Sequence, residues 1–141
     1  MAGPVAPPVE VIDASVAVEW FVDSGPAFGG AVAILRRLQD EPGRFVVPEL
    51  FFQEVHAVLC RKLSSPGEVG TALRHLWRLG MRCLPWEPDV AELAAELAFR
   101  FRISGYDATY LATARIVAGV WLTFDRKAHQ RVASLGLSRL V

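Results

Sequence analysis

The sequence predicts an α/β protein: a five-stranded parallel sheet sandwiched between helices. Short apolar runs of four or five residues alternate with longer segments of helical periodicity. That alternation is typical of parallel strands buried on both faces. The chain has 141 residues and shows no internal repeat, so it can bury one sizeable core and is expected to be a single domain.

The five strands are expected in the apolar runs that lie between helix signals. The first strand follows residues 1–8, a proline-containing segment that is expected to be a flexible leader. The domain itself therefore spans residues 9–141. The predicted strands are Val9–Ile12, Arg44–Val47, Met81–Leu84, Val120–Thr123 and Leu137–Val141.

The helices are predicted from apolar spacing and from residues that favour helix ends. Ser65 and Glu68 form a capping-box pattern, and Ser15 and Ser104 are candidate N-caps. Gly119 is expected to end the helix before the fourth strand. The predicted helices cover residues 16–22, 26–39, 48–63, 66–79, 88–101, 105–118 and 126–134.

The composition excludes several classes of protein. With 52% hydrophobic and 21% charged residues, the chain is neither a disordered tail nor a collagen-like fibre. Its two cysteines, Cys60 and Cys83, are too few for a disulfide framework and favour a cytoplasmic location. No run of 18 uncharged apolar residues occurs, so no membrane span is expected.

Charge is balanced overall but unevenly distributed. Lys plus Arg equals Asp plus Glu, 15 against 15, so the chain is not expected to coat nucleic acid by bulk charge. From residue 99 onward, seven basic residues face two acidic ones, which gives +5 there and −5 in residues 1–98. The basic end indicates either a polyanionic partner or ordinary solvated helix faces.

Four acidic residues follow predicted strands or lie in the helices near their ends: Asp13, Glu54, Asp107 and Asp125. Each has a simple structural interpretation, as a helix cap (Asp13, Asp125), a capping-box partner (Asp107) or a solvated helix residue (Glu54). However, Asp13, Glu54 and Asp107 have apolar neighbours, and buried carboxylates are costly unless paired or metal-bound. If the topology brings these positions to one sheet edge, they form a functional site.

Other common sites are missing from the sequence. The histidines and cysteines lack zinc-site spacing, and no phosphate-binding glycine motif or nucleophile elbow is present. Oxygen ligands alone remain, and these suit hard cations such as Mg²⁺ or Mn²⁺.

Four motifs, in order along residues 9–141, resemble those of PIN-domain proteins, and especially the VapC toxins of bacterial toxin–antitoxin pairs. They are Val11-Ile12-Asp13-Ala14-Ser15-Val16, the segment 48–55 that ends in Glu54-Val55, the segment 104–112 with Asp107, and Leu122-Thr123-Phe124-Asp125-Arg126. The resemblance implies a metal-dependent endoribonuclease that cuts a structured RNA, such as a tRNA or ribosomal RNA. It also implies a homodimer and a cognate, VapB-like antitoxin.

The resemblance assigns the catalytic and metal-binding roles to Asp13, Glu54, Asp107 and Asp125. Asp13 and Asp107 are expected to be the nearest ligands, with the other two holding metal-bound waters or a second ion. Ser15 and Thr123 are expected to orient these carboxylates, unless they are merely a helix cap and a strand-end hydroxyl.

Positive and apolar residues supply further candidates for contacts with partners. Arg126 and Lys127 are expected to meet the RNA backbone, or else to be solvated. Apolar residues of the helices at 16–22 and 26–39 belong either to the core or to a groove for an antitoxin helix. These residues are Trp20, Phe21, Phe28, Ile34, Leu35 and Leu38.

Two other classes of protein are alternatives. A phospho-accepting receiver domain needs adjacent acids after the first strand, but Ala14 follows Asp13, and strand three ends at Leu84-Pro85 without an acceptor Asp. A non-catalytic binding module with the same fold is compatible with the motifs. An RNA cleavage assay separates that module from the enzyme.

Overall fold

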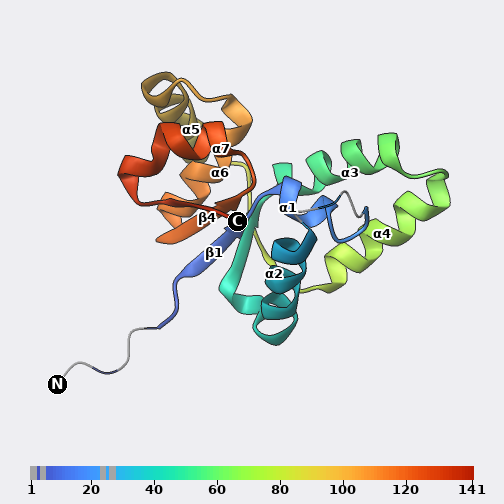
Figure 1. The fold of residues 1–141 in the computed structure, drawn as a ribbon. Coiled ribbons are helices and arrows are strands. Elements are labelled where there is room, and N and C mark those ends of the chain that lie inside the picture. Colours follow the sequence, from blue (N-terminus) through green and yellow to red (C-terminus); the bar gives the residue numbers. More distant parts are fainter. Residues whose placement is uncertain (1–2, 4–5, 23–24, 26–27) are drawn as a thin grey trace.

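The five strands form one parallel sheet in the order β3-β2-β1-β4-β5 (Figure 1). The computed structural model describes residues 3, 6–22, 25 and 28–141. The chain runs from β1 outward to β2 and β3, and then returns to the other side of β1 for β4 and β5. The strands are β1 (Val9–Ile12), β2 (Phe45–Pro48), β3 (Arg82–Leu84), β4 (Gly119–Thr123) and β5 (Ser138–Leu140).

Helices cover both faces of the sheet, as the sequence predicts. In Figure 1, α5, α6 and α7 lie on one side, α1 and α2 lie on the other, and α3 and α4 form a hairpin that extends away from the sheet. The helices are α1 (Ala14–Val18), α2 (Phe28–Asp40), α3 (Leu50–Lys62), α4 (Pro66–Arg78), α5 (Pro88–Phe101), α6 (Gly105–Ile116) and α7 (Arg126–Val132). Short 3-10 turns, η1 (Pro42–Arg44) and η2 (Ala133–Leu135), precede β2 and β5.

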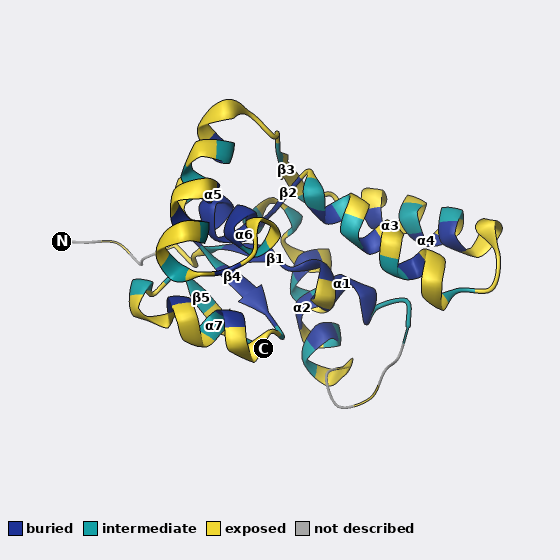
Figure 2. Cartoon of the chain, turned by 90° about the horizontal axis from the view of Figure 1, so that it is seen from above, coloured by how far each residue is buried: buried dark blue, intermediate teal, exposed yellow. Residues whose placement is uncertain are grey.

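The core surrounds the central strands, and one large part of it lies between them and α6 (Figure 2). In the register of β1 and β4, Val11 pairs with Trp121 and Ile12 pairs with Leu122. All four side chains are fully buried. The ring of Tyr110 from α6 stacks on Trp121 with centroids 6.1 Å apart, so α6 is held against the centre of the sheet.

Several predicted helix ends were wrong. Asp13, not Ser15, is the N-cap of α1, because its side chain accepts a hydrogen bond from the Ser15 backbone N–H at 2.9 Å. The α1 helix ends at Val18 rather than at residue 22. Pro48 closes β2 instead of opening α3, which begins at Leu50.

Gly119 was expected to end a helix, and instead it begins β4. The α6 helix stops at Ile116, and Ala118 is the residue with a positive φ, 54°. A Cβ on Gly119 would lie 2.5 Å from the Val9 carbonyl oxygen. Gly119 is therefore required for the close approach of β4 to β1, not for a turn.

The apolar side of α2 belongs to the core. Ile34 and Leu38 are buried, and Leu35 packs against the core from a partly buried position. Trp20 and Phe21, which follow α1, also pack against the core, whereas Phe28 is exposed. Pro26, the predicted start of this helix, lies outside the described residues, as do residues 1–2 and 4–5 of the predicted leader. No helix in the described ranges is long and apolar enough to span a membrane.

Candidate active site

The strand order reverses between β1 and β4, and in open parallel sheets ligands bind beyond the carboxyl ends of the strands at such a point. Asp13 directly follows β1, and Asp125 follows β4 after one intervening residue. Glu54 comes from α3 and Asp107 from the first turn of α6. The fold thus carries the predicted acids to the same edge of the sheet.

Asp13 is buried and firmly oriented. One carboxylate oxygen accepts from the Ser15 backbone N–H at 2.9 Å, and the other accepts from the Trp121 indole N–H at 3.0 Å. Burial raises the pKa of Asp13, while hydrogen bonds from Ser15, Thr123 and Trp121 oppose that rise. Ser15 and Thr123 therefore lie within hydrogen-bonding reach of this carboxylate.

Glu54 is half-buried, and one of its oxygens has no partner. Its Oε1 atom is inaccessible to solvent and makes no hydrogen bond of ordinary geometry, and the same holds for the nearby Tyr110 hydroxyl. Burial raises the pKa of Glu54, and the charges of Asp13 and Asp107 raise it further, although Tyr110 opposes the rise. The pKa of Tyr110 is itself raised well above its usual value, so its hydroxyl stays neutral beside the acids.

Asp107 and Asp125 complete the group of acids. The Asp107 backbone N–H donates to Ser104 Oγ at 3.0 Å, which caps α6. Burial raises the pKa of Asp107, and the charges of Asp13 and Asp125 raise it further. Asp125 is more exposed and caps α7 by accepting from the Ala128 N–H at 3.0 Å. Asp125 therefore caps a helix and also belongs to the group of acids.

The oxygen donors fit a hard divalent cation. Carboxylates that raise the pKa of a neighbouring acid need either protons or a cation, and carboxylate oxygens are ligands that a hard cation prefers. Within the described ranges, no group of three or more His, Cys, Asp or Glu side chains is placed to hold an ion directly.

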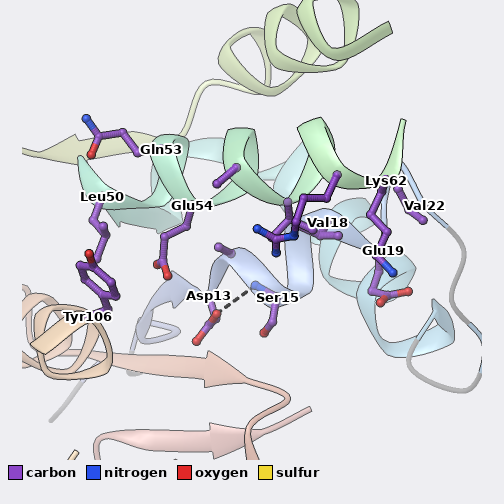
Figure 3. A pocket seen from close by; sticks show the side chains of 14 residues that line it. Asp13, Ser15, Val18, Glu19, Val22, Leu50, Gln53, Glu54, Lys62 and Tyr106 are labelled. Atoms are coloured by element: carbon purple, nitrogen blue, oxygen red, sulfur yellow. Dashed lines mark hydrogen bonds between the residues drawn. The ribbon is translucent and has the colours of Figure 1, made fainter. Parts of the chain in front are cut away.

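A cleft of about 650 Å³ lies between α1 and α3 and includes two of the acids. In Figure 3, Asp13 and Glu54 lie in its middle, Tyr106 lies at one end, and Lys62 and Val22 lie at the other. The lining residues are Asp13, Ala14, Ser15, Val18, Glu19, Val22, Leu50, Gln53, Glu54, Ala57, Val58, Arg61, Lys62 and Tyr106.

The cleft contains residues that the motifs did not indicate. Arg61 and Lys62 lie about two turns beyond Glu54 on α3, so helical spacing could have placed them on the same face. Trp121 was expected only as a strand residue, and nothing local in the sequence indicates its hydrogen bond to Asp13, 108 residues away. Arg126 and Lys127 are exposed at the start of α7 and do not line this cleft.

Fold and site together define a class: a single α/β domain with a cluster of acidic oxygen ligands at the switch point of a parallel sheet. The chain belongs to the PIN domain family, whose model matches residues 11–135. A comparison with curated protein sequences gave no significant match.

Solved structures share the fold over almost the whole chain. A toxin–antitoxin complex from Klebsiella pneumoniae is 18% identical, with a TM-score of 0.68, covering 92% of this chain and 95% of its own. VapC20 of Mycobacterium tuberculosis, described as a sarcin–ricin loop cleaving toxin, is 18% identical, with a TM-score of 0.68 and coverage of 91% and 95%. FitAcB from Neisseria gonorrhoeae is 18% identical, with a TM-score of 0.66 and coverage of 88% and 93%.

Proposed function

We propose that this protein is a divalent-metal-dependent endoribonuclease and the toxin of a toxin–antitoxin pair. The observation that carries the proposal is the cluster of Asp13, Glu54, Asp107 and Asp125 at the switch point, in which neighbouring acids raise the pKa of Glu54 and of Asp107. Membership in the PIN family and the structural likeness to toxins support it.

The cation is expected to be Mg²⁺ or Mn²⁺. Asp13 and Asp107 would be its nearest ligands, with Glu54 and Asp125 holding its waters. When bound, such an ion polarises a phosphate and lowers the pKa of a water molecule. Asp13 is oriented for this role by Trp121, whose indole nitrogen is 3.0 Å from its carboxylate.

The positive residues of the cleft define where an RNA backbone would lie. Arg61 and Lys62 share the cleft with Asp13 and Glu54, so they can hold phosphates next to the acidic centre. Arg126 and Lys127, beside Asp125, would meet more distant phosphates. A tRNA or a ribosomal RNA is the expected substrate, in keeping with the sarcin–ricin loop activity named for one structural neighbour.

A VapB-like antitoxin is the expected protein partner. The chain itself is expected to form a homodimer and to act in the cytoplasm. A structural neighbour solved as a toxin–antitoxin complex supports such a partner. Since the apolar side of α2 is committed to the core, the antitoxin would use the cleft between α1 and α3, where Val18, Val22 and Val58 offer apolar contacts.

The test is cleavage of a structured RNA in Mn²⁺ by nearly isosteric variants. Asp13→Asn, Glu54→Gln, Asp107→Asn and Asp125→Asn should each lower the rate at least about tenfold, because each removes an expected metal or water ligand. Their melting temperatures should be unchanged or higher without metal. Glu96→Gln, on the exposed side of α5, is the matched control and should cleave like the parent.

Two results would contradict the proposal. If two or more of the four variants cleave at the parental rate, the acids are not the catalytic centre. If the parent itself cleaves no RNA while it binds a partner through the cleft, the protein is a non-catalytic module with a PIN fold.

A further inference from the structure

A second hollow, of about 620 Å³, opens beside the acidic cleft where α3 and α6 begin. Its walls combine two large aromatic rings with small polar groups. The lining residues are Glu49, Leu50, Gln53, Trp86, Ser104, Gly105, Tyr106 and Thr109.

The aromatic side chains of this hollow are largely exposed to solvent. Trp86 is 53% exposed and Tyr106 is 64% exposed, although burying large aromatic surface is favourable. Trp77, which is equally exposed at 58%, differs because its ring stacks on Phe52 at 5.0 Å. Among the described residues, neither Trp86 nor Tyr106 makes a ring contact with another aromatic side chain. More than half of each side chain is therefore open to solvent and can contact a flat ligand.

The hollow is continuous with the acidic cleft. Leu50, Gln53 and Tyr106 line both cavities. Tyr106 also directly precedes Asp107 in the first turn of α6, and Figure 3 shows it at the end of the cleft nearest Glu54. A ligand bound in the hollow would thus lie next to any group held at the carboxylates.

We propose that this hollow is a nucleobase subsite, in which a base next to the cleaved phosphodiester stacks on Trp86 and Tyr106. The inference rests on the proposed ribonuclease function. Unpaired bases of RNA are commonly held on aromatic side chains while polar groups contact their edges. Gln53 and Ser104 supply such groups, since an amide both donates and accepts and a hydroxyl does the same.

The same placement gives a path for the RNA strand along α3. Lys62 lies at the end of the cleft opposite Tyr106, with Asp13 and Glu54 between them, and Arg61 precedes Lys62 on α3 and also lines the cleft. Phosphates on one side of the cleaved bond meet the basic end, and the base on the other side enters the aromatic hollow. The subsite selects single-stranded RNA, because a base inside a duplex cannot present its face to a side chain.

The experiment measures binding of a labelled single-stranded RNA of about six nucleotides, a length within the usual range of single-strand binding sites. An Asp13→Asn background slows cleavage, and Asn caps a helix as well as Asp does. In this background, Trp86→Ala and Tyr106→Ala should each weaken binding about 5- to 150-fold. Trp86→Phe and Tyr106→Phe keep a stacking ring and should retain most of the affinity.

Matched controls and an abasic series make the assignment specific. Trp77→Ala and Phe99→Ala remove other exposed aromatic rings, 58% and 89% exposed, and should bind as the parent does. The same RNA is then prepared with one base removed at each position in turn. Removing one particular base should weaken RNA binding to the Asp13→Asn protein. It should have little further effect on binding when that protein also carries Trp86→Ala.

The possible outcomes separate this subsite from the proposed function. If RNA binds the parent but Trp86→Ala, Tyr106→Ala and every abasic RNA behave like the parent, the subsite is wrong and the nuclease proposal stands. If the alanine variants instead lose only antitoxin binding, the hollow is a protein-binding surface. If the parent binds no RNA at all, both proposals fail. Should an alanine variant fail to fold, the phenylalanine variants and the abasic series decide.

Discussion

The carboxyl groups of Asp13, Glu54 and Asp107 are held together by the fold against their own repulsion. Burial is the largest cause of each raised pKa, and neighbouring acids add to it at Glu54 and Asp107. Two like charges 4 Å apart repel by about 4 kcal/mol at an effective dielectric constant near 20. Each of these three side chains therefore destabilises the folded state when it is ionised, relative to its protonated form.

This electrostatic penalty predicts a pH-dependent stability difference at Glu54. Because the folded-state pKa of Glu54 is raised, the folded protein binds its proton more tightly than the unfolded chain does. The destabilisation is absent below the unfolded pKa and grows as pH rises to the folded pKa. Metal-free Glu54→Gln should therefore melt like the parent in acid and at a higher temperature than the parent at neutral pH.

Thermal melts in a chelating buffer across this pH range provide the measurement. Glu96→Gln is again the control, because Glu96 is exposed on α5 and its removal should give the same small difference at every pH. A Glu54→Gln difference that does not change with pH would show that the acids do not destabilise one another in the folded state.

At the scale of elements, one buried charge connects four segments of the chain. Glu10 lies in β1 with its side chain 1% exposed, and its carboxylate contacts three arginines. Arg37 of α2 is 2.6 Å away, Arg44 of η1 is 3.0 Å away, and Arg139 of β5 is 2.5 Å away. The cluster ties the last strand to the first strand and to the helix that covers it.

Glu10→Gln should destabilise the protein by about 1.5–3 kcal/mol, the usual net value of a hydrogen bond to a charged group. The amide cannot accept from all three arginines, and their charges then repel one another. Glu41→Gln is a closely matched control, because Glu41 also contacts Arg44, at 3.4 Å, but is 58% exposed. It should change stability by no more than about 1 kcal/mol. Urea denaturation measures both, and equal effects would show that burial of Glu10 does not matter.

The Glu10 cluster also shows why some features cannot be predicted from the sequence. The approximate positions of strands and helices follow from local apolar patterns and caps, and Asp13 and Asp125 stand out because they come just after strands. Contacts of Glu10 with residues 27, 34 and 129 positions away depend on the strand order, which no local pattern determines. Gly119 is similar, because the close approach of Val9 that requires it is a property of the paired strands.

At the scale of the molecule, the uneven charge of the sequence is only partly engaged in contacts within the fold. Residues 99–141 carry a net charge of +5, and this suggested contact with a polyanion. However, Arg139 is committed to Glu10, and Arg131 donates to the Arg102 carbonyl. The positive charge that shares a cleft with the acids instead comes from Arg61 and Lys62, in the acidic part of the sequence.

The whole folded chain is required to bring the acids together, so a cation bound by them should stabilise the whole molecule. Asp13, Glu54, Asp107 and Asp125 come from separate segments, and the unfolded chain has no comparable site. A ligand that binds only the folded state stabilises it by RT ln(1 + [L]/Kd), about 2.7 kcal/mol at a hundredfold excess over Kd. For a domain of this size, that corresponds to a rise in Tm of roughly 10 °C.

Thermal melts at increasing Mn²⁺ concentration measure this linkage in the parent and in two variants. Asp107→Asn removes an expected ligand and should abolish most of the rise, although the neutral side chain raises the metal-free Tm. Glu96→Gln leaves the cluster intact and should show the full parental rise. A parent whose Tm ignores millimolar Mn²⁺ would contradict the proposed cation site. An equal rise in all three proteins would place the ion elsewhere on the molecule, because only the carboxylate cluster differs between the parent and Asp107→Asn.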